Sequence, residues 1–551
     1  MTEIQNINNR KREIFAVCAV LLLSAVIAFW MLSEKTLDSH ECFVSVTARE
    51  MLLSGDWVLP TCNGNLRINK TPLSYWLVGI TAKITGSVDN FSARLPSAVF
   101  AILSAAAILY FVNRTLNLRI AVISAAVWAT SLAYIRGSHW ARPDMALTFF
   151  VMLCLLSFYA AAVAESRRRQ VIYALIFWIS FALGNLAKGP APIPYVLLPI
   201  VSYVAVFRRW KLLPKLLPIV GLILFLAVVL PWPLAIAQRV NWNLLVWKRE
   251  FIDRFFGDYV PGHYPIYFYF LMMFKFVTPW VIFLPMALAA PFYRLWNEKQ
   301  SAMKFFWLWF VAGMVFLTIN AGKRQHYILP LMPAMAILIG VILEDLVFTQ
   351  TAYTKNFAKN ILKWHIIIAV AGILGAVIYL AIAKSRLVIP VILLGIIAIA
   401  ASLFVALLFV NKKPAFACVA IFAAIAAWVM IADFCFLPLL DINRSSRDFA
   451  ETVARIVPRS ENLVSYGDTS SRFVQYFGKV VPDIRDESAL VECYRKGGWI
   501  VAVSPHLEEL DKIGCTFRKI YRSEKFSDEG KEDSRGALFH KSAPVYDSNG
   551  I

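Results

Sequence analysis

The chain has 551 residues, of which 59% are hydrophobic and 16% are charged, and its formal net charge is +20. A soluble protein of this length would carry about a quarter charged residues, so the composition excludes an ordinary soluble globular protein. Many of the basic residues lie in short loops between apolar runs. This distribution disfavours a nucleic-acid-binding protein, which would gather them on one soluble face.

Long apolar runs predict a polytopic α-helical membrane protein. A helix needs roughly 20 mostly apolar residues to cross a hydrocarbon core of about 30 Å, and within that core helices satisfy every backbone donor and acceptor. Only Lys188, Gly189 and Pro190 divide the fifth run from the sixth, so the sequence leaves counts of twelve and fourteen spans open. We expect about thirteen transmembrane helices, at about 14–33, 95–112, 119–136, 145–164, 171–187, 190–206, 216–236, 266–289, 304–320, 326–346, 364–382, 388–410 and 415–436.

The distribution of basic residues predicts that the N-terminus is cytoplasmic. The first run follows Arg10 to Arg12 and lacks a small-residue cleavage site, so we expect a retained helix and not a removed signal peptide. Every loop then expected inside carries Lys or Arg, as at Arg167 to Arg169 and at Lys412 with Lys413. With an odd number of spans, the C-terminal segment lies outside.

The segment at about 37–90 is the first large exterior region. Its apolar residues Ala48, Met51 and Leu52, and further on Trp76 and Ile80, recur at helical spacing. This pattern predicts amphipathic helices that lie on the bilayer surface.

The chain changes character at Asp441. Apolar runs shorten to strand length at Leu463 to Tyr466 and at Trp499 to Val503, separated by Gly, Ser and charged residues. We therefore predict a transmembrane domain over residues 1–440 and a small soluble α/β domain over residues 441–551.

Two acids stand where the chain enters apolar runs. Glu41 opens the first exterior loop, and partial desolvation there can raise the pKa of a carboxylate and suit it to take a proton from an acceptor hydroxyl. Asp144 follows Arg142 and Pro143 at the start of the fourth run, where burial of an ionisable group is expensive unless it is used. The alternatives are an acid that solvates the loop at Glu41 and an N-terminal helix charge at Asp144.

Several cations lie on the exterior side, which the charge rule would leave without basic residues. Lys70 precedes a proline break and aromatic residues, and Lys188 sits in a tight turn between two apolar runs. Both can offer a point charge to a phosphate, although Lys70 could also snorkel to the interface. The loop at about 237–265 carries Arg249 and Arg254, and arginine's planar fork suits bidentate phosphate binding. Charge alone does not say which arginine would serve, and a solvated loop with internal ion pairs is the alternative. His326 lies in another basic turn.

The sequence predicts no required cofactor. A zinc site on His40, Glu41 and His139 is conceivable, but no HExxH or paired CxxC pattern supports a divalent metal. GxGxxG and P-loop patterns are missing as well, which disfavours a nucleotide-driven pump. Cys42 with Cys62, and Cys493 with Cys515, could pair in an oxidising compartment.

The order of these elements resembles the GT-C class of polyprenyl-phosphate-dependent glycosyltransferases, most closely the lipid A aminoarabinose transferase family and its protein mannosyltransferase relatives. The likeness covers residues 36–335 and rests on an ordered series: Glu41 followed by Ala48 to Met51 and Gly55-Asp56-Trp57; Lys70-Thr71-Pro72-Leu73 with Tyr75-Trp76; Ala93-Arg94-Leu95-Pro96; Arg142-Pro143-Asp144; Leu186 to Pro190; Pro231-Trp232; Glu250 and Arg254; and Tyr327-Ile328-Leu329-Pro330. The sequence departs from the family at His40-Glu41, which replaces an Asp-Glu pair, and at Lys70-Thr71-Pro72, which replaces Lys-Pro-Pro.

The resemblance implies transfer of a sugar from undecaprenyl phosphate outside a bacterial cytoplasmic membrane. Lys70, Lys188 and Arg254 would stabilise charge on the departing lipid phosphate. Glu41 and Asp144 would orient or deprotonate an acceptor, which could be a lipid A-like glycolipid, a glycan or a protein. His40, Arg142, His326 and Tyr327 would line the pocket for sugar and acceptor.

Two other functional classes remain open from the sequence. A transporter or lipid-linked sugar flippase would also need many helices and intramembrane charges, but it predicts inverted repeats and a site near the midplane. A scaffold that displays the C-terminal domain leaves the charges at the membrane boundary unexplained. Consumption of a polyprenyl-phosphate sugar by the purified protein separates these classes from a transferase.

Overall fold

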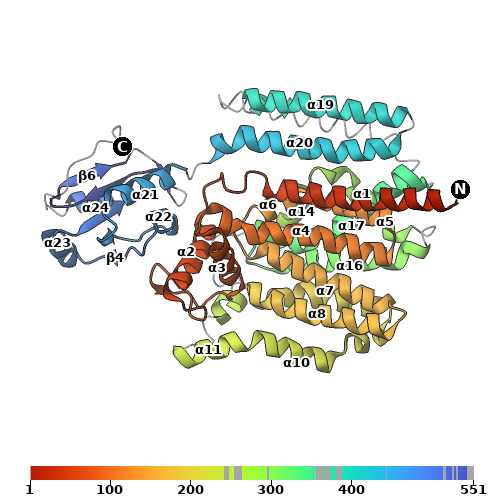
Figure 1. Ribbon diagram of the computed structural model, residues 1–551, viewed down its shortest axis with the longest axis horizontal. Coiled ribbons are helices and arrows are strands. Elements are labelled where there is room, and N and C mark those ends of the chain that lie inside the picture. Colours follow the sequence, from red (N-terminus) through yellow and green to blue (C-terminus); the bar gives the residue numbers. More distant parts are fainter. Residues whose placement is uncertain are drawn as a thin grey trace. The chain divides into compact units, whose positions relative to one another are not determined.

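A computed structural model of the chain shows a helical unit and a mixed unit that contains a β-sheet (Figure 1). The helical unit comprises Met1–Met31, Asn69–Leu73 and Pro96–Phe436, and the mixed unit comprises Leu32–Ile68, Ser74–Leu95 and Leu437–Ile551. The structure describes residues 2–240, 247–253, 264–293, 297–351, 353–354, 367, 374–375, 377–379, 382, 388–411, 413–441, 444–504, 506–512, 517–523, 526–528 and 531–542.

The helical unit is built almost entirely of apolar helices. Its α-helices are α1 (Thr2–Phe29), α4 (Asn90–Thr115), α5 (Leu118–Ala129), α6 (Leu132–Ser138), α7 (Asp144–Val163), α8 (Arg167–Lys188), α9 (Pro192–Val206), α10 (Pro218–Val229), α11 (Pro231–Arg239), α14 (Phe268–Val277), α15 (Leu284–Ala289), α16 (Asn297–Ile319), α17 (Met332–Glu344), α19 (Val388–Val410) and α20 (Pro414–Leu440). Short 3-10 or π turns connect them, at η1 (Trp210–Leu216), η2 (Lys248–Asp253), η3 (Trp280–Phe283), η4 (Ala290–Phe292), η5 (Gln325–Leu331) and η6 (Asp345–Thr349).

The prediction of a polytopic helical membrane protein is confirmed. Within the described residues, nine helices are long and apolar enough to cross a membrane, or up to eleven if two bent pairs each count as one span. The bends of 61° between α5 and α6 and of 114° after α14 divide two of the predicted spans. The predicted span at 190–206 is the shorter helix α9, and most of the span at 364–382 lies outside the described residues.

Small residues allow close helix packing in this unit. A Cβ atom on Gly340 of α17 would lie 2.1 Å from the hydroxyl oxygen of Ser124 on α5, so these two backbones approach closely only because residue 340 is glycine. The helices α19 and α20 run side by side (Figure 1), and the indole of Trp428 donates to the Leu394 carbonyl at 3.2 Å.

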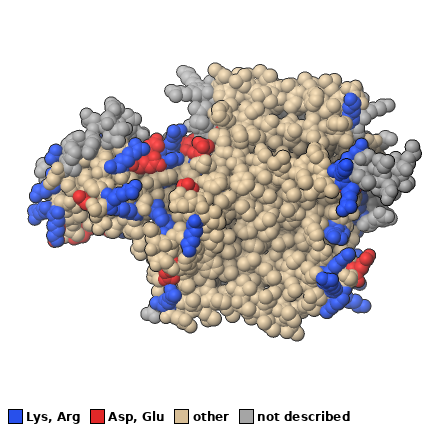
Figure 2. All heavy atoms as spheres, in the orientation of Figure 1, with Lys and Arg blue, Asp and Glu red and all other residues tan. Residues whose placement is uncertain are grey.

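On the face of the helical unit that Figure 2 shows, few charged residues lie over the middle. Figure 2 shows a broad band of uncharged residues, with Lys and Arg gathered at the end of the unit where α1 begins. This distribution is typical of a protein that crosses a bilayer.

The mixed unit combines the first loop with the C-terminal residues. From the first loop come α2 (Ser39–Ser54), the two-stranded pair β1 (Thr61–Cys62) and β2 (Asn65–Leu66), and α3 (Leu73–Thr85). From the C-terminus come α21 (Arg444–Ile456), β3 (Leu463–Tyr466), α22 (Ser471–Phe477), β4 (Asp483–Ile484), α23 (Glu487–Arg495), β5 (Trp499–Val503), α24 (His506–Lys512), β6 (Lys519–Arg522), β7 (Phe526–Asp528), β8 (Lys531–Ser534) and β9 (Gly536–Phe539).

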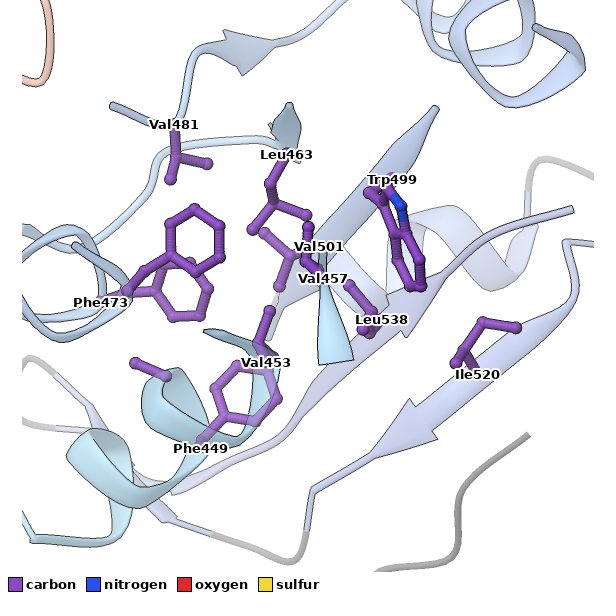
Figure 3. Packing of buried hydrophobic residues seen from close by; sticks show 12 residues of the cluster. Phe449, Val453, Val457, Leu463, Phe473, Val481, Trp499, Val501, Ile520 and Leu538 are labelled. Atoms are coloured by element: carbon purple, nitrogen blue, oxygen red, sulfur yellow. The ribbon is translucent and has the colours of Figure 1, made fainter. Parts of the chain in front are cut away.

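A five-stranded sheet with the order β4-β3-β5-β9-β6 forms the C-terminal core. The strand β3 pairs in parallel with β4 and β5, and β9 pairs antiparallel with β5 and β6. Side chains of β5 alternate between the two faces, because Trp499 and Val501 join one apolar cluster and Ile500 and Ala502 join the other. Figure 3 shows the first cluster, in which Phe449 of α21 and Phe473 of α22 pack toward the sheet.

The helix α22 fastens the first loop to the C-terminal sheet inside this unit. Arg49 of α2 donates to the carbonyls of Val474 and Gln475, at 2.7 and 2.8 Å. The hydroxyl of Tyr476 accepts from the Leu37 amide at 2.8 Å and lies 2.9 Å from the side-chain oxygen of Asn90. These hydrogen bonds hold both ends of the first loop against one short helix.

Candidate active site

Asp144, Lys188 and His326 meet at one end of the α7–α8 helical hairpin. The two helices have 20 and 22 residues and are joined by a short connection. The start of α7 and the end of α8 therefore lie at the same end of the hairpin. Asp144 forms an ion pair with Lys188, and its carboxylate lies 3.8 Å from Nε2 of His326 on η5. Asp144 is 4% exposed. Lys188 and His326 are half-buried, so three predicted site residues from distant parts of the sequence form one cluster around a buried acid.

Aromatic rings border this cluster. The ammonium group of Lys188 lies 4.8 Å from the ring centroid of Tyr327, a cation–π contact. The ring of His326 is edge-on to Trp140, and the guanidinium of Arg142 lies 5.2 Å from the Trp140 ring. The structure thus connects Arg142, His326 and Tyr327 to the Asp144–Lys188 pair.

Lys70 forms an ion pair with Glu250 of η2 in the same unit. The Lys70 side chain is 38% exposed and that of Glu250 is 13% exposed. Arg254, the third predicted phosphate ligand, lies outside the described residues.

Glu41 lies in the mixed unit and is 2% exposed. Its two carboxylate oxygens accept from Arg94 at 2.9 and 3.0 Å, and one of them also accepts from the Asp38 amide at 2.9 Å. Asp38 in turn accepts from the amides of residues 40 and 41, so the two acids form a capping box at the start of α2. In this geometry Glu41 stabilises the local fold, and its predicted role as a base stays a prediction.

The other predicted first-loop groups have different surroundings. His40 is exposed on α2, with its ring 6.5 Å from that of Phe43. In the helical unit, the ring nitrogens of His139 lie 2.7 and 2.9 Å from the carbonyls of Ile135 and Trp30. Among the described residues no group of three His, Cys, Asp or Glu is placed to hold a metal ion. The cofactor requirement stays a prediction.

The sequence left the pairing of Cys42 with Cys62 open, and in this structure both are free thiols. Cys42 is fully buried on α2, and burial raises the pKa of its thiol well above the ordinary value. Cys493 is also free, and Cys515 lies outside the described residues.

The cluster in the helical unit can bind an anion and hold a hydroxyl group. Lysine ammonium groups present three donors each, and a carboxylate at a helix N-terminus accepts hydrogen bonds from a nearby hydroxyl. Aromatic rings beside these charges can pack on a sugar. Such a set suits transfer of a group away from a phosphate.

Two residues with no predicted role form ion pairs with predicted site residues. Glu250 and Arg94 appeared only as members of the ordered series, yet each pairs with a predicted site residue. Arg94 could have been singled out from its position at the start of an apolar run, because a charge there is expensive unless it has a partner. The pairing of Lys70 with Glu250, 180 residues apart, carries no local signal.

Comparison with protein families identifies a match over residues 69–234, to the model described as dolichyl-phosphate-mannose-protein mannosyltransferase. Two curated relatives are undecaprenyl phosphate-alpha-4-amino-4-deoxy-L-arabinose arabinosyl transferases. The protein from Pseudomonas aeruginosa (strain LESB58) is 30% identical over 337 residues, covering 59% of each chain. The protein from Enterobacter sp. (strain 638) is 28% identical over 314 residues, covering 56% of each. The chain therefore matches less than two thirds of the length of these relatives.

A solved structure extends the likeness to nearly the whole fold. The crystal structure of ArnT from Cupriavidus metallidurans bound to undecaprenyl phosphate superposes with a TM-score of 0.80 at 19% identity, covering 95% of this chain and 97% of that one. The chain has the ArnT fold, and the resemblance predicted from the ordered motifs is confirmed.

Proposed function

We propose that this chain, which has the ArnT fold and resembles the arabinosyl transferases, is a membrane glycosyltransferase that uses an undecaprenyl-phosphate-linked sugar. The observation that carries the proposal is the 30% identity over 337 residues to a transferase named for such a donor. The fold shared with ArnT supports it over the parts of the chain that the sequence alignment does not reach.

The proposed reaction is an inverting displacement at the anomeric carbon of the donor sugar. The acceptor oxygen forms the new bond from the face opposite the phosphate, and the bond between sugar and phosphate breaks. Undecaprenyl phosphate leaves with the bonding electron pair, so negative charge grows on the phosphate. Lys70, Lys188 and Arg254 are the cations that we propose to stabilise this charge.

Asp144 is the acid that the described cluster favours for the acceptor side. It is buried beside Lys188 and His326, and a carboxylate in such a setting can orient an acceptor hydroxyl and take its proton. Glu41 remains a second candidate for this role. Where the acceptor is already an anionic phosphate, no base is needed and Asp144 would position the sugar.

The proposed acceptor is a lipid A-like glycolipid, a glycan or a protein outside the membrane. We place the enzyme in the bacterial inner membrane, with its N-terminus in the cytoplasm and the active site and residues 441–551 on the outer side. The basic residues of the predicted inner loops support this orientation.

Turnover of a purified donor tests the proposed function. Protein in detergent micelles is incubated with undecaprenyl-phosphate aminoarabinose and lipid A, and release of undecaprenyl phosphate is measured. We expect turnover by the unsubstituted protein, and a loss of at least about 100-fold for Asp144→Asn, which is the size typical of a lost acid–base group. A matched control is Asp89→Asn, at a loop acid outside the proposed site.

The outcome separates the proposal from its alternatives. No consumption of this donor or of other undecaprenyl-phosphate sugars would reject the transferase. Movement of the donor across a vesicle membrane without cleavage would instead establish a flippase. Normal turnover by Asp144→Asn, with donor consumption intact, would reject only the assigned acid.

A further inference from the structure

Two lysine-bearing turns lie at the end of the α7–α8 hairpin. One is the segment Asn69–Leu73, which contains Lys70, and the other is the turn at Lys188, Gly189 and Pro190. They are more than a hundred residues apart in the chain. Lys188 is the last residue of α8, and Lys70 lies between β2 and α3. Some contact must fix one turn against the other for both lysines to serve one phosphate.

A hydrogen bond between the two turns provides this contact. The buried amide of Gly189 donates to the hydroxyl oxygen of Thr71 at 3.1 Å, across 118 residues of sequence. Thr71 directly follows Lys70, and Gly189 directly follows Lys188. The bond therefore links the backbone beside one lysine to the side chain beside the other.

The geometry of Gly189 makes this acceptor necessary. Gly189 follows the last residue of α8 with φ 57° and ψ −142°, a conformation that favours glycine. A buried amide without an acceptor is costly, so the turn keeps this shape only while an acceptor is present. Thr71, which is 6% exposed, supplies that acceptor.

Apolar packing by Leu73 also attaches the Lys70 segment to the hairpin. Leu73 packs against a buried cluster of Ala146 and Phe150 on α7 and Ala187 on α8. These residues lie close in sequence to Asp144 and Lys188. The Lys70 segment is thus attached to the hairpin twice, by Leu73 through van der Waals contact and by Thr71 through a directed bond.

We propose that Thr71 is a positioning residue that holds the Lys188 turn in the conformation that binds the donor phosphate. The inference rests on the proposed function, since it assigns to Lys188 a role toward phosphate. Thr71 acts through the Gly189 amide and does not itself need to touch the substrate. A threonine is suited to this task because its hydroxyl accepts while its methyl group packs in the buried turn.

Binding of undecaprenyl phosphate to purified full-length protein in detergent tests the proposal. Thr71→Val keeps the shape and removes the acceptor, and we expect binding to weaken on the order of tenfold, the effect of one unsatisfied buried amide. Thr71→Ser retains the hydroxyl and should bind within about threefold of the unsubstituted protein. Thr71→Ala is a second variant that lacks the hydroxyl. All variants are compared by size-exclusion elution and by the midpoint of thermal unfolding.

A second measurement separates positioning of Lys188 from a general structural effect. In a Lys188→Gln background, Thr71→Val should cause no further weakening, because the group that it positions is already neutral. Equal binding by Thr71→Val, Thr71→Ala and Thr71→Ser would overturn the proposal, as would a full additional loss in the Lys188→Gln background. Normal binding by Lys188→Gln would reject the phosphate role of Lys188 in the proposed function, whereas weakened binding by Lys188→Gln with normal binding by Thr71→Val would reject only the positioning role of Thr71.

Discussion

Arg94 forms a buried ion pair with Glu41 and also makes hydrogen bonds to the backbone. Besides both oxygens of Glu41, Arg94 donates to the backbone carbonyls of Leu32, Lys35 and Thr36, at 3.1, 2.7 and 3.4 Å. These carbonyls lie between the end of α1 and the start of α2. The planar guanidinium, with five donors, can reach all of them at once, which a lysine ammonium cannot.

The substitution Arg94→Lys should therefore destabilise the protein strongly. Lysine keeps the positive charge but offers three donors in place of five, and each buried acceptor left without a donor costs about 1–3 kcal/mol. We expect a clearly lower midpoint of thermal unfolding for the purified protein in detergent. Arg459→Lys, at an exposed site of the same unit, is the matched control and should leave the midpoint unchanged. Equal midpoints for the two variants would contradict the structural importance of the pair.

The residues Glu41 and Asp144 show what sequence could and could not predict. Both were recognised as acids at membrane boundaries, and the Asp144–Lys188 pair follows from two helices of similar length joined by a short connection. The engagement of Glu41 by Arg94 depends on where α4 starts relative to α2, which no local pattern specifies. A catalytic expectation for Glu41 could thus be formed from sequence without any sign of its ion pair.

At the scale of single elements, α22 has more influence than its seven residues suggest. Besides the bonds of Arg49 and Tyr476, Gln475 donates to the Val88 carbonyl at 3.0 Å. Just after α22, Asn63 and Val481 exchange two hydrogen bonds, each of 2.8 Å. The helix and its following turn thereby contact the first loop along most of its length.

Removal of one hydroxyl from this contact should be measurable. Tyr476→Phe leaves the Leu37 amide without its acceptor, and an unsatisfied buried group costs about 1–3 kcal/mol. We expect faster trypsin cleavage in residues 32–95 and a lower unfolding midpoint. The control is Tyr267→Phe, at a side chain that is 58% exposed. Cleavage rates that match in both variants would argue against α22 as the fastener of the loop.

The sequence predicted the bounds of two strands but not a bend between two helices. The strands expected at Leu463 to Tyr466 and Trp499 to Val503 have those bounds in the structure, because short apolar runs between Gly and Ser are a local signal. The bend between α5 and α6 was missed. At that point the hydroxyls of Thr130 and Ser131 donate hydrogen bonds to backbone carbonyls of the preceding turn. The apolar pattern of the sequence continues through the break, so it gives no sign of the bend.

At the scale of the whole molecule, one compact unit is assembled from two distant parts of the sequence. Residues 32–68 and 74–95 join residues 437–551. The boundary predicted at residue 440 separated these parts, because composition marks where apolar character ends and carries no information about which soluble segments fold together. The predicted domain division itself stays a prediction.

Deletion of residues 445–551 should then affect more than the C-terminal sheet. The first loop would lose α22 and the hydrogen bonds that it supplies, so we expect residues 32–95 to become sensitive to protease and donor turnover to fall at least about tenfold, since several buried bonds are lost together. A chain shortened only by residues 543–551 keeps every described element and serves as the control. Full turnover by the longer deletion, with a protected first loop, would be incompatible with this dependence.

The two parts of the mixed unit can come together only late in synthesis of the chain. Arg49 and Gln475 are separated by 426 residues, so at about 5–20 residues per second the ribosome delivers the second roughly 20–85 s after the first. During that interval the nascent first loop has no α22 to dock on. Arg49 therefore completes its hydrogen bonds to α22 only after nearly the whole chain has been synthesised.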